Sequence, residues 1–199
     1  MLNHTKAYKI SILALFIAFI IIQNYIPLFG YSPVGPLSLT TIQITVIIAG
    51  IILGPVDGGI VGGVWGFLSL IKAFTAPSSP FEPLVFTNPL ISILPRILVG
   101  LFAGYLFILF GHIIKKTSIN MIITGLLGAL LNTILVLGMI YLFYRTPEVA
   151  KAYGASNPAM IGKLLLIVVG TNGIPEAILS AIVTPLIADP ILHFVKRDD

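Results

Sequence analysis

Apolar runs of membrane-spanning length recur along this 199-residue chain and leave little room for a water-soluble fold. The first run continues from Ile10 to Ile22 and beyond. Charged residues make up only 9% of the chain, whereas a soluble domain carries about 25%. Because a membrane helix needs about 20 predominantly apolar residues, the sequence predicts an all-α integral membrane protein that forms a single membrane domain over residues 1–199.

The predicted membrane helices follow these apolar runs. Six segments fit, namely Tyr8–Ile26, Leu39–Leu53, Gly58–Phe74, Ile91–Ile114, Ile119–Tyr144 and Met160–Val195. We expect a turn at Gly54–Gly58, and breaks in the last segment near Gly173–Pro175 and Asp189–Pro190, because proline kinks a helix. The second and third segments are short, which favours a cavity at one end of the bundle.

The even number of predicted helices places both termini on one side of the membrane. The short connection on that side carries Lys115 and Lys116, whereas Pro27–Leu37 on the other side has no charge. Since positive charges in short loops favour the cytoplasmic side, we expect both termini in the cytoplasm. The outer loops are then Pro27–Leu37, Thr75–Leu90 and Arg145–Pro158, and long loops often form lids or binding sites.

Signatures of enzymes and nucleotide-binding proteins are absent from the sequence. It contains no cysteine, no Gly-x-x-x-x-Gly-Lys-Ser/Thr loop and no His-Glu-x-x-His motif. His4, His112 and His193 lie near predicted helix ends, where interfacial positions explain them better than a metal site does. The net charge of +4 comes without a polybasic run, so nucleic acid is not an expected partner. We expect no enzymatic activity and no cofactor.

Arg96 carries a large free-energy cost of membrane insertion, because its charge lies within an apolar segment, directly after Pro95. An arginine at the centre of a membrane helix costs roughly 2.5–3.5 kcal/mol on insertion scales. Further polar groups gather near the outer ends of the third to sixth predicted helices. Two cations with several amides suit a small ligand that carries a carboxylate with hydroxyl and amide groups. The candidate binding residues are Trp65, Lys72, Thr87, Asn88, Arg96, Asn132, Asn172 and Glu176.

Structural roles compete with ligand binding for each of these residues. Arg96 and Lys72 could extend to the outer headgroups, and Arg96 could instead pair with Glu176. Asn132 could form a hydrogen bond between helices. Asn172 and Glu176 could cap the ends of a broken helix. The single tryptophan could lie in the aromatic belt at the membrane surface rather than in a cavity wall.

Small and polar residues mark four stretches of the chain. These stretches are the Ala-x-x-x-Ala spacing at Ala14–Ala18, then Gly35–Thr45, Leu53–Gly66 and Phe86–Arg96. Together they resemble the substrate-binding S component of energy-coupling factor (ECF) transporters. Within that family the chain looks most like the pantothenate-specific branch.

The resemblance implies a six-helix fold with an outward-facing vitamin site, covered by the loops after the first and third helices. It implies that Ala14 and Ala18 pack on a membrane-embedded coupling protein, and that two separate ATPases supply the energy. Hydroxymethylpyrimidine or pyridoxine is the alternative ligand; neither is a carboxylate, so either would involve Trp65 more than Arg96 and Lys72. A stand-alone secondary carrier is the alternative class of transporter.

Overall fold

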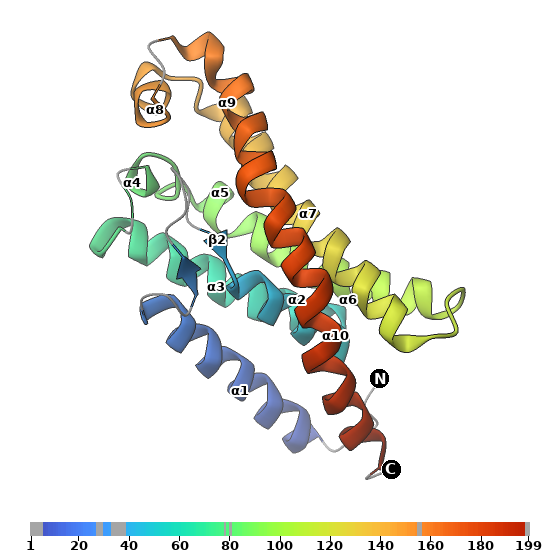
Figure 1. The fold of residues 1–199 in the computed structure, drawn as a ribbon. Coiled ribbons are helices and arrows are strands. Elements are labelled where there is room, and N and C mark those ends of the chain that lie inside the picture. Colours follow the sequence, from blue (N-terminus) through green and yellow to red (C-terminus); the bar gives the residue numbers. More distant parts are fainter. Residues whose placement is uncertain are drawn as a thin grey trace.

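The computed structural model describes residues 6–26, 30–32, 39–77, 79, 81–154 and 157–197, and most of these residues are helical (Figure 1). The longer helices are α1 (Lys6–Tyr25), α2 (Ile42–Leu53), α3 (Pro55–Thr75), α6 (Leu94–Gly111), α7 (Thr117–Phe143), α9 (Ile161–Val168) and α10 (Ile174–Arg197). A π-helical segment, Val169–Gly173, joins α9 to α10.

Short elements form the connections between the long helices. They are the paired strands β1 (Tyr31–Ser32) and β2 (Leu39–Thr40), the helices α4 (Glu82–Val85), α5 (Pro89–Ser92) and α8 (Pro147–Ala152), and a 3-10 turn at Pro158–Met160. Five helical stretches of the described chain are long and apolar enough to cross a membrane, and α2 is a shorter apolar helix. The predicted all-α membrane fold is therefore confirmed.

Helix α2 lies at the centre of the bundle and contacts α1, α3, α6, α7 and α10. All of its 12 residues are buried, which explains why its sequence is apolar all round. At 1.5 Å per residue it is about 18 Å long, shorter than the hydrocarbon core of about 30 Å. The hairpin of β1 and β2 precedes α2 and lies with α4 and α8 at the end of the molecule opposite Lys6 and Arg197 (Figure 1).

Helices α3 and α6 pack backbone to backbone through small residues. Gly58, Gly62 and Gly66 follow one another at four-residue intervals along α3 and face α6. A Cβ atom on Gly66 would lie 2.6 Å from the Cα atom of Ile93, and one on Gly58 would lie 2.7 Å from the carbonyl oxygen of Gly100. Small residues at this spacing permit such close approach in membrane bundles.

Replacing Gly62 by alanine should destabilise the protein by about 1–3 kcal/mol, because the new Cβ atom would collide with the backbone carbonyl of Arg96 on α6. Thermal unfolding in detergent measures the effect. Gly63→Ala is the matched control, since a Cβ atom there meets only the side chain of Ile97, at 3.4 and 3.7 Å. Equal unfolding temperatures for the two variants would contradict the close packing at Gly62.

The third helix begins earlier than the sequence suggests and is not short. Gly54 has a φ of 99°, in the left-handed region that glycine adopts readily, and this single residue reverses the chain after α2. Pro55 starts α3 because the first helical position needs no N–H donor. The predicted turn is therefore confined to Gly54, its predicted extension to Gly58 was wrong, and α3 has 21 residues.

The last helix is continuous where two breaks were predicted. In the π segment the N–H of Ile174 donates to the carbonyl of Val169, so the first expected break is a widened helical turn. Helix α10 then continues through Pro185 and Pro190. A proline removes a single hydrogen bond, and packing against neighbouring helices keeps such a helix intact at membrane depth.

Two of the predicted outer loops contain short helices. Thr146 accepts a hydrogen bond from the backbone of Val149 (3.4 Å) at the start of α8, as an N-cap residue does. The rings of Phe81 and Tyr153 meet edge to face with centroids 4.6 Å apart and join the two loops. Most of the remaining predicted outer loop, Pro27–Leu37, lies outside the described residues.

Candidate functional site

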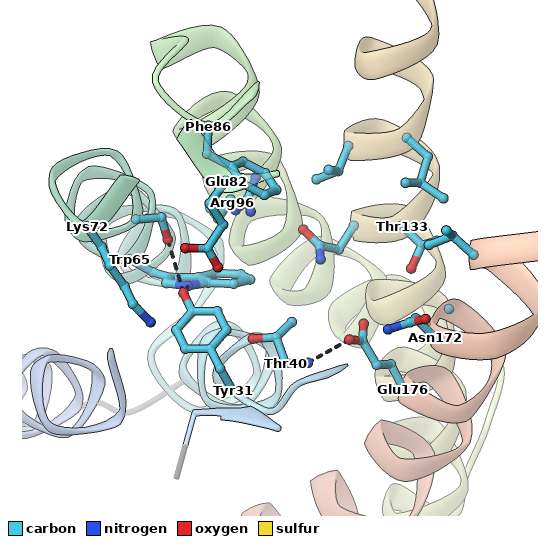
Figure 2. Close-up of a pocket in the computed structure, with 16 residues that line it drawn as sticks. Tyr31, Thr40, Trp65, Lys72, Glu82, Phe86, Arg96, Thr133, Asn172 and Glu176 are labelled. Carbon is cyan, nitrogen blue, oxygen red and sulfur yellow. Dashed lines mark hydrogen bonds between the residues drawn. The ribbon is translucent and has the colours of Figure 1, made fainter. Parts of the chain in front are cut away.

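A cavity opens at the end of the bundle that carries the hairpin and α4 (Figure 2). Its walls come from α3, α6, α7, the π segment and α10, and residues of β1, β2 and α4 complete it. It has about 760 Å³ of empty space including its open mouth.

Arg96 presents a buried positive charge to the cavity. Its side chain is only 6% exposed, and its Nη1 donates to the carbonyl oxygen of Ile91 at 2.6 Å. The guanidinium carbon lies 5.0 Å from the ring centroids of both Trp65 and Phe86. These contacts fix the orientation of the group, while Nε has no hydrogen-bond partner among the described residues. Arg96 thus directs an oriented positive charge toward the cavity.

The Tyr31 hydroxyl connects the hairpin to α1 and α3. It accepts from Trp65 Nε1 at 3.2 Å, donates to Asn24 Oδ1 at 3.2 Å and lies 3.3 Å from the hydroxyl of Ser69 (Figure 2). Burial raises the pKa of the Tyr31 phenol, so the hydroxyl remains protonated as this network requires. The Lys72 ammonium lies 3.9 Å from the centre of the Tyr31 ring. A second cation therefore borders the cavity on the α3 side.

Acceptor groups lie on the α7 and α10 side of the cavity. Glu176 accepts from the backbone N–H of Thr40 at 2.6 Å and from Gln43 Nε2 at 2.9 Å (Figure 2). Asn132 Nδ2 donates to Gln43 Oε1 at 2.9 Å, which leaves Asn132 Oδ1 buried and unpaired within the described chain. Thr171 donates to Asn172 Oδ1 at 2.8 Å. The cavity therefore offers Arg96 and Lys72, together with the Glu82 carboxylate, on one side and further oxygen acceptors on the other.

Comparison with known proteins identifies the family of this cavity-bearing bundle. The profile of the family described as ECF transporter, substrate-specific component, matches residues 8–188. The chain belongs to this family. It is 33% identical to the pantothenate transporter PanT of Leuconostoc mesenteroides, over 98% of both chains, and 32% identical to the pantothenic acid transporter PanT of Lactococcus lactis, over 94% of both. The protein is thus an S component, a transport protein and not an enzyme.

The structure of this S component brings six of the eight predicted site residues to the cavity, namely Trp65, Lys72, Arg96, Asn132, Asn172 and Glu176. Thr87 and Asn88 do not line it. Thr87 donates to the carbonyl oxygen of Pro83 at 2.9 Å, and Asn88 caps α5 by accepting from the backbone of Leu90 at 3.0 Å. Both side chains thus serve the local turns that lead into α6.

The structure also bears on the competing structural roles. No ion pair joins Arg96 to Glu176 within the described residues, because Arg96 and Glu176 bind other groups. Glu176 holds β2 and α2 rather than capping α10. Trp65 is 1% exposed and lies in the cavity wall, far more buried than a residue of the aromatic belt. Asn132 does connect two helices, and it lines the cavity as well.

Several lining residues of this S component were not predicted. Ser69 lies four residues after Trp65 and three before Lys72, so helical spacing could have found it. Glu82 and Phe86 come from a loop that was predicted to cover the site, but its sequence does not single them out. Tyr31 lies in a loop with no periodic pattern, and only its hydrogen bonds to α1 and α3 identify its role.

Proposed function

We propose that this S component binds pantothenate and presents it for ATP-driven uptake. The observation that carries this proposal is the buried Arg96 guanidinium, which lines the cavity with an Nε that has no hydrogen-bond partner among the described residues. A buried charge of this kind is stable when a ligand neutralises it. The family supplies the transport role, and two relatives of similar length are named pantothenate transporters.

Pantothenate fits the distribution of polar groups in the cavity. Its carboxylate can accept charge-assisted hydrogen bonds from Arg96, with Lys72 as a second cation nearby. Its amide and two hydroxyl groups can donate to acceptors such as Asn132 Oδ1 and Glu176. The indole ring of Trp65 supplies an apolar wall. Hydroxymethylpyrimidine and pyridoxine lack a carboxylate and would leave Arg96 without a counter-charge.

The partners in this proposal are an ECF coupling protein in the membrane and two ATP-binding subunits. Ala14 and Ala18 support a helix contact, because both are exposed on the face of α1 opposite the fully buried Ile20. Small residues four apart let a second helix approach closely. The hairpin and α4 contribute residues to the cavity and lie at the end of the bundle opposite the two termini (Figure 1), so cytoplasmic termini would place the cavity on the outer side.

Titration of the purified protein with pantothenate tests the proposed ligand. Trp65 is the only tryptophan and lies in the cavity wall, so its fluorescence should change on binding. We expect saturable binding of pantothenate, and mass spectrometry of the co-purified small molecule should find the same compound. Binding of pyridoxine or hydroxymethylpyrimidine without pantothenate would contradict the assignment. Uptake by this chain alone, in liposomes without ATPases, would instead favour a secondary carrier.

A further inference from the structure

Gln43 lies just outside the cavity, and its side chain connects two residues that line it. Gln43 is fully buried in α2. Its Nε2 donates to Glu176 Oε2 at 2.9 Å, and its Oε1 accepts from Asn132 Nδ2 at 2.9 Å. A single chain of hydrogen bonds thus passes from α10 through α2 to α7.

The carboxylate of Glu176 determines the direction of this chain. Both Glu176 oxygens accept hydrogen bonds, one from the backbone N–H of Thr40 and the other from the Gln43 side chain. The end of the Gln43 amide that faces Glu176 must therefore be the NH₂ group. Gln43 Oε1 then faces Asn132, which must turn its own NH₂ group toward Gln43. The orientation of both amides thus follows from the two acceptor oxygens of Glu176.

Because the Asn132 NH₂ group is bound to Gln43, the Asn132 carbonyl oxygen is held in a fixed position as an acceptor. Asn132 is only 6% exposed, and its Oδ1 is buried without a hydrogen-bond partner in the described part of the chain. Buried acceptors in native proteins are normally paired. Since Asn132 lines the cavity, a donor group of the ligand is the partner that completes it.

We infer that Gln43 is a positioning residue that fixes the polarity of the Asn132 amide, so that the cavity selects a ligand with a hydroxyl donor in addition to its carboxylate. This inference rests on the proposed function and goes beyond it, because Gln43 does not line the cavity. An Asn132 amide turned the other way would offer a donor and would no longer favour the hydroxyl group.

The test compares pantothenate with its two analogues in which one hydroxyl is replaced by hydrogen. In the native protein at least one analogue should bind about tenfold more weakly, because Asn132 Oδ1 then stays unpaired. Gln43→Met has a similar length and no polar hydrogen-bonding group that could orient Asn132. In this variant the preference for the hydroxyl should fall to about twofold or less.

A reciprocal exchange should restore the preference. In the double variant Gln43→Glu with Glu176→Gln, the new carboxylate accepts from Asn132, and the new amide accepts from Thr40 and donates to the carboxylate. Every partner is then satisfied and Asn132 keeps its orientation, so the preference should return to about tenfold. Thr45→Val is the matched control on α2, because it removes a buried interhelical bond to Gln23 Oε1 (2.8 Å) away from the cavity. It should leave the preference unchanged.

The outcomes separate this inference from the proposed function. Equal binding of both analogues to the native protein, or an undiminished preference in Gln43→Met, overturns the role of Gln43 while pantothenate binding still stands. Failure of the native protein to bind pantothenate refutes the proposed function instead. If Gln43→Met does not fold, the double variant decides, and a folded double variant that binds without preference overturns the inference.

Discussion

Replacing Arg96 by alanine should weaken pantothenate binding between about tenfold and about 100-fold. The guanidinium is buried and already oriented by Ile91, Trp65 and Phe86, so it can bind a carboxylate without further ordering. Hydrogen bonds to charged groups contribute about 1.5–3 kcal/mol, and about 1.4 kcal/mol corresponds to a factor of ten. Equilibrium titration of the purified variant measures the loss, with calorimetry as a check because Arg96 contacts the fluorescent Trp65.

A neutral ligand distinguishes charge recognition from a general loss of structure. Pantothenol carries a hydroxymethyl group in place of the carboxylate, so the native protein should bind it more weakly than pantothenate. In the Arg96→Ala variant the difference between the two compounds should narrow, with Lys72 as the remaining cation at the cavity. Arg145→Ala is the matched control, because Arg145 lies over the ring of Tyr141 (5.0 Å) and does not line the cavity. Unchanged pantothenate affinity in a folded Arg96→Ala variant would remove Arg96 from the site.

Replacing Ala14 by tryptophan should abolish co-purification with the ECF coupling protein and leave pantothenate affinity unchanged. The large ring would hold the partner helix away from the backbone of α1, where small residues permit close contact. The side chain of Ala14 faces outward, and it does not line the cavity. Affinity capture of tagged, co-expressed subunits measures assembly, and vitamin uptake should fall in parallel.

Two further variants make this result specific to the proposed helix face. Ala18→Trp should behave like Ala14→Trp, because the two residues lie on the same side of α1. Gly138→Trp is the control, since Gly138 is exposed on α7 with no heavy atom within 4 Å of a Cβ atom placed there. Assembly that survives both alanine substitutions would refute the proposed interface.

The apolar runs predicted the long helices well. A membrane helix satisfies its backbone hydrogen bonds internally and needs a long apolar segment, so length and hydropathy identify it in the sequence. The exceptions have local causes. Gly54 reverses the chain in a single residue, which no hydropathy pattern reveals. The π segment before Pro175 and the continuous helix through Pro190 depend on packing against neighbouring helices. The presence of proline was therefore not enough to predict a break in the helix.

The residues of the candidate site that could be predicted are those whose charge is costly to place in an apolar membrane segment. Arg96, Lys72 and Glu176 stand out for that reason, and all three line the cavity. Thr87 and Asn88 were grouped with them by proximity in sequence, yet their side chains bind the local backbone. Polar residues in a turn compete for such local hydrogen bonds, and a sequence does not show which partner wins.

Length and hydropathy alone establish that this chain is a helical membrane protein, and Arg96 stands out in the sequence as a charge within an apolar segment. What surrounds that arginine, and which way the amides point, follows from how the helices pack against one another. Gln43, Asn132 and Glu176 come from three helices far apart in the sequence, and their hydrogen bonds acquire a direction only when the helices pack. That direction depends on contacts that no single helix contains.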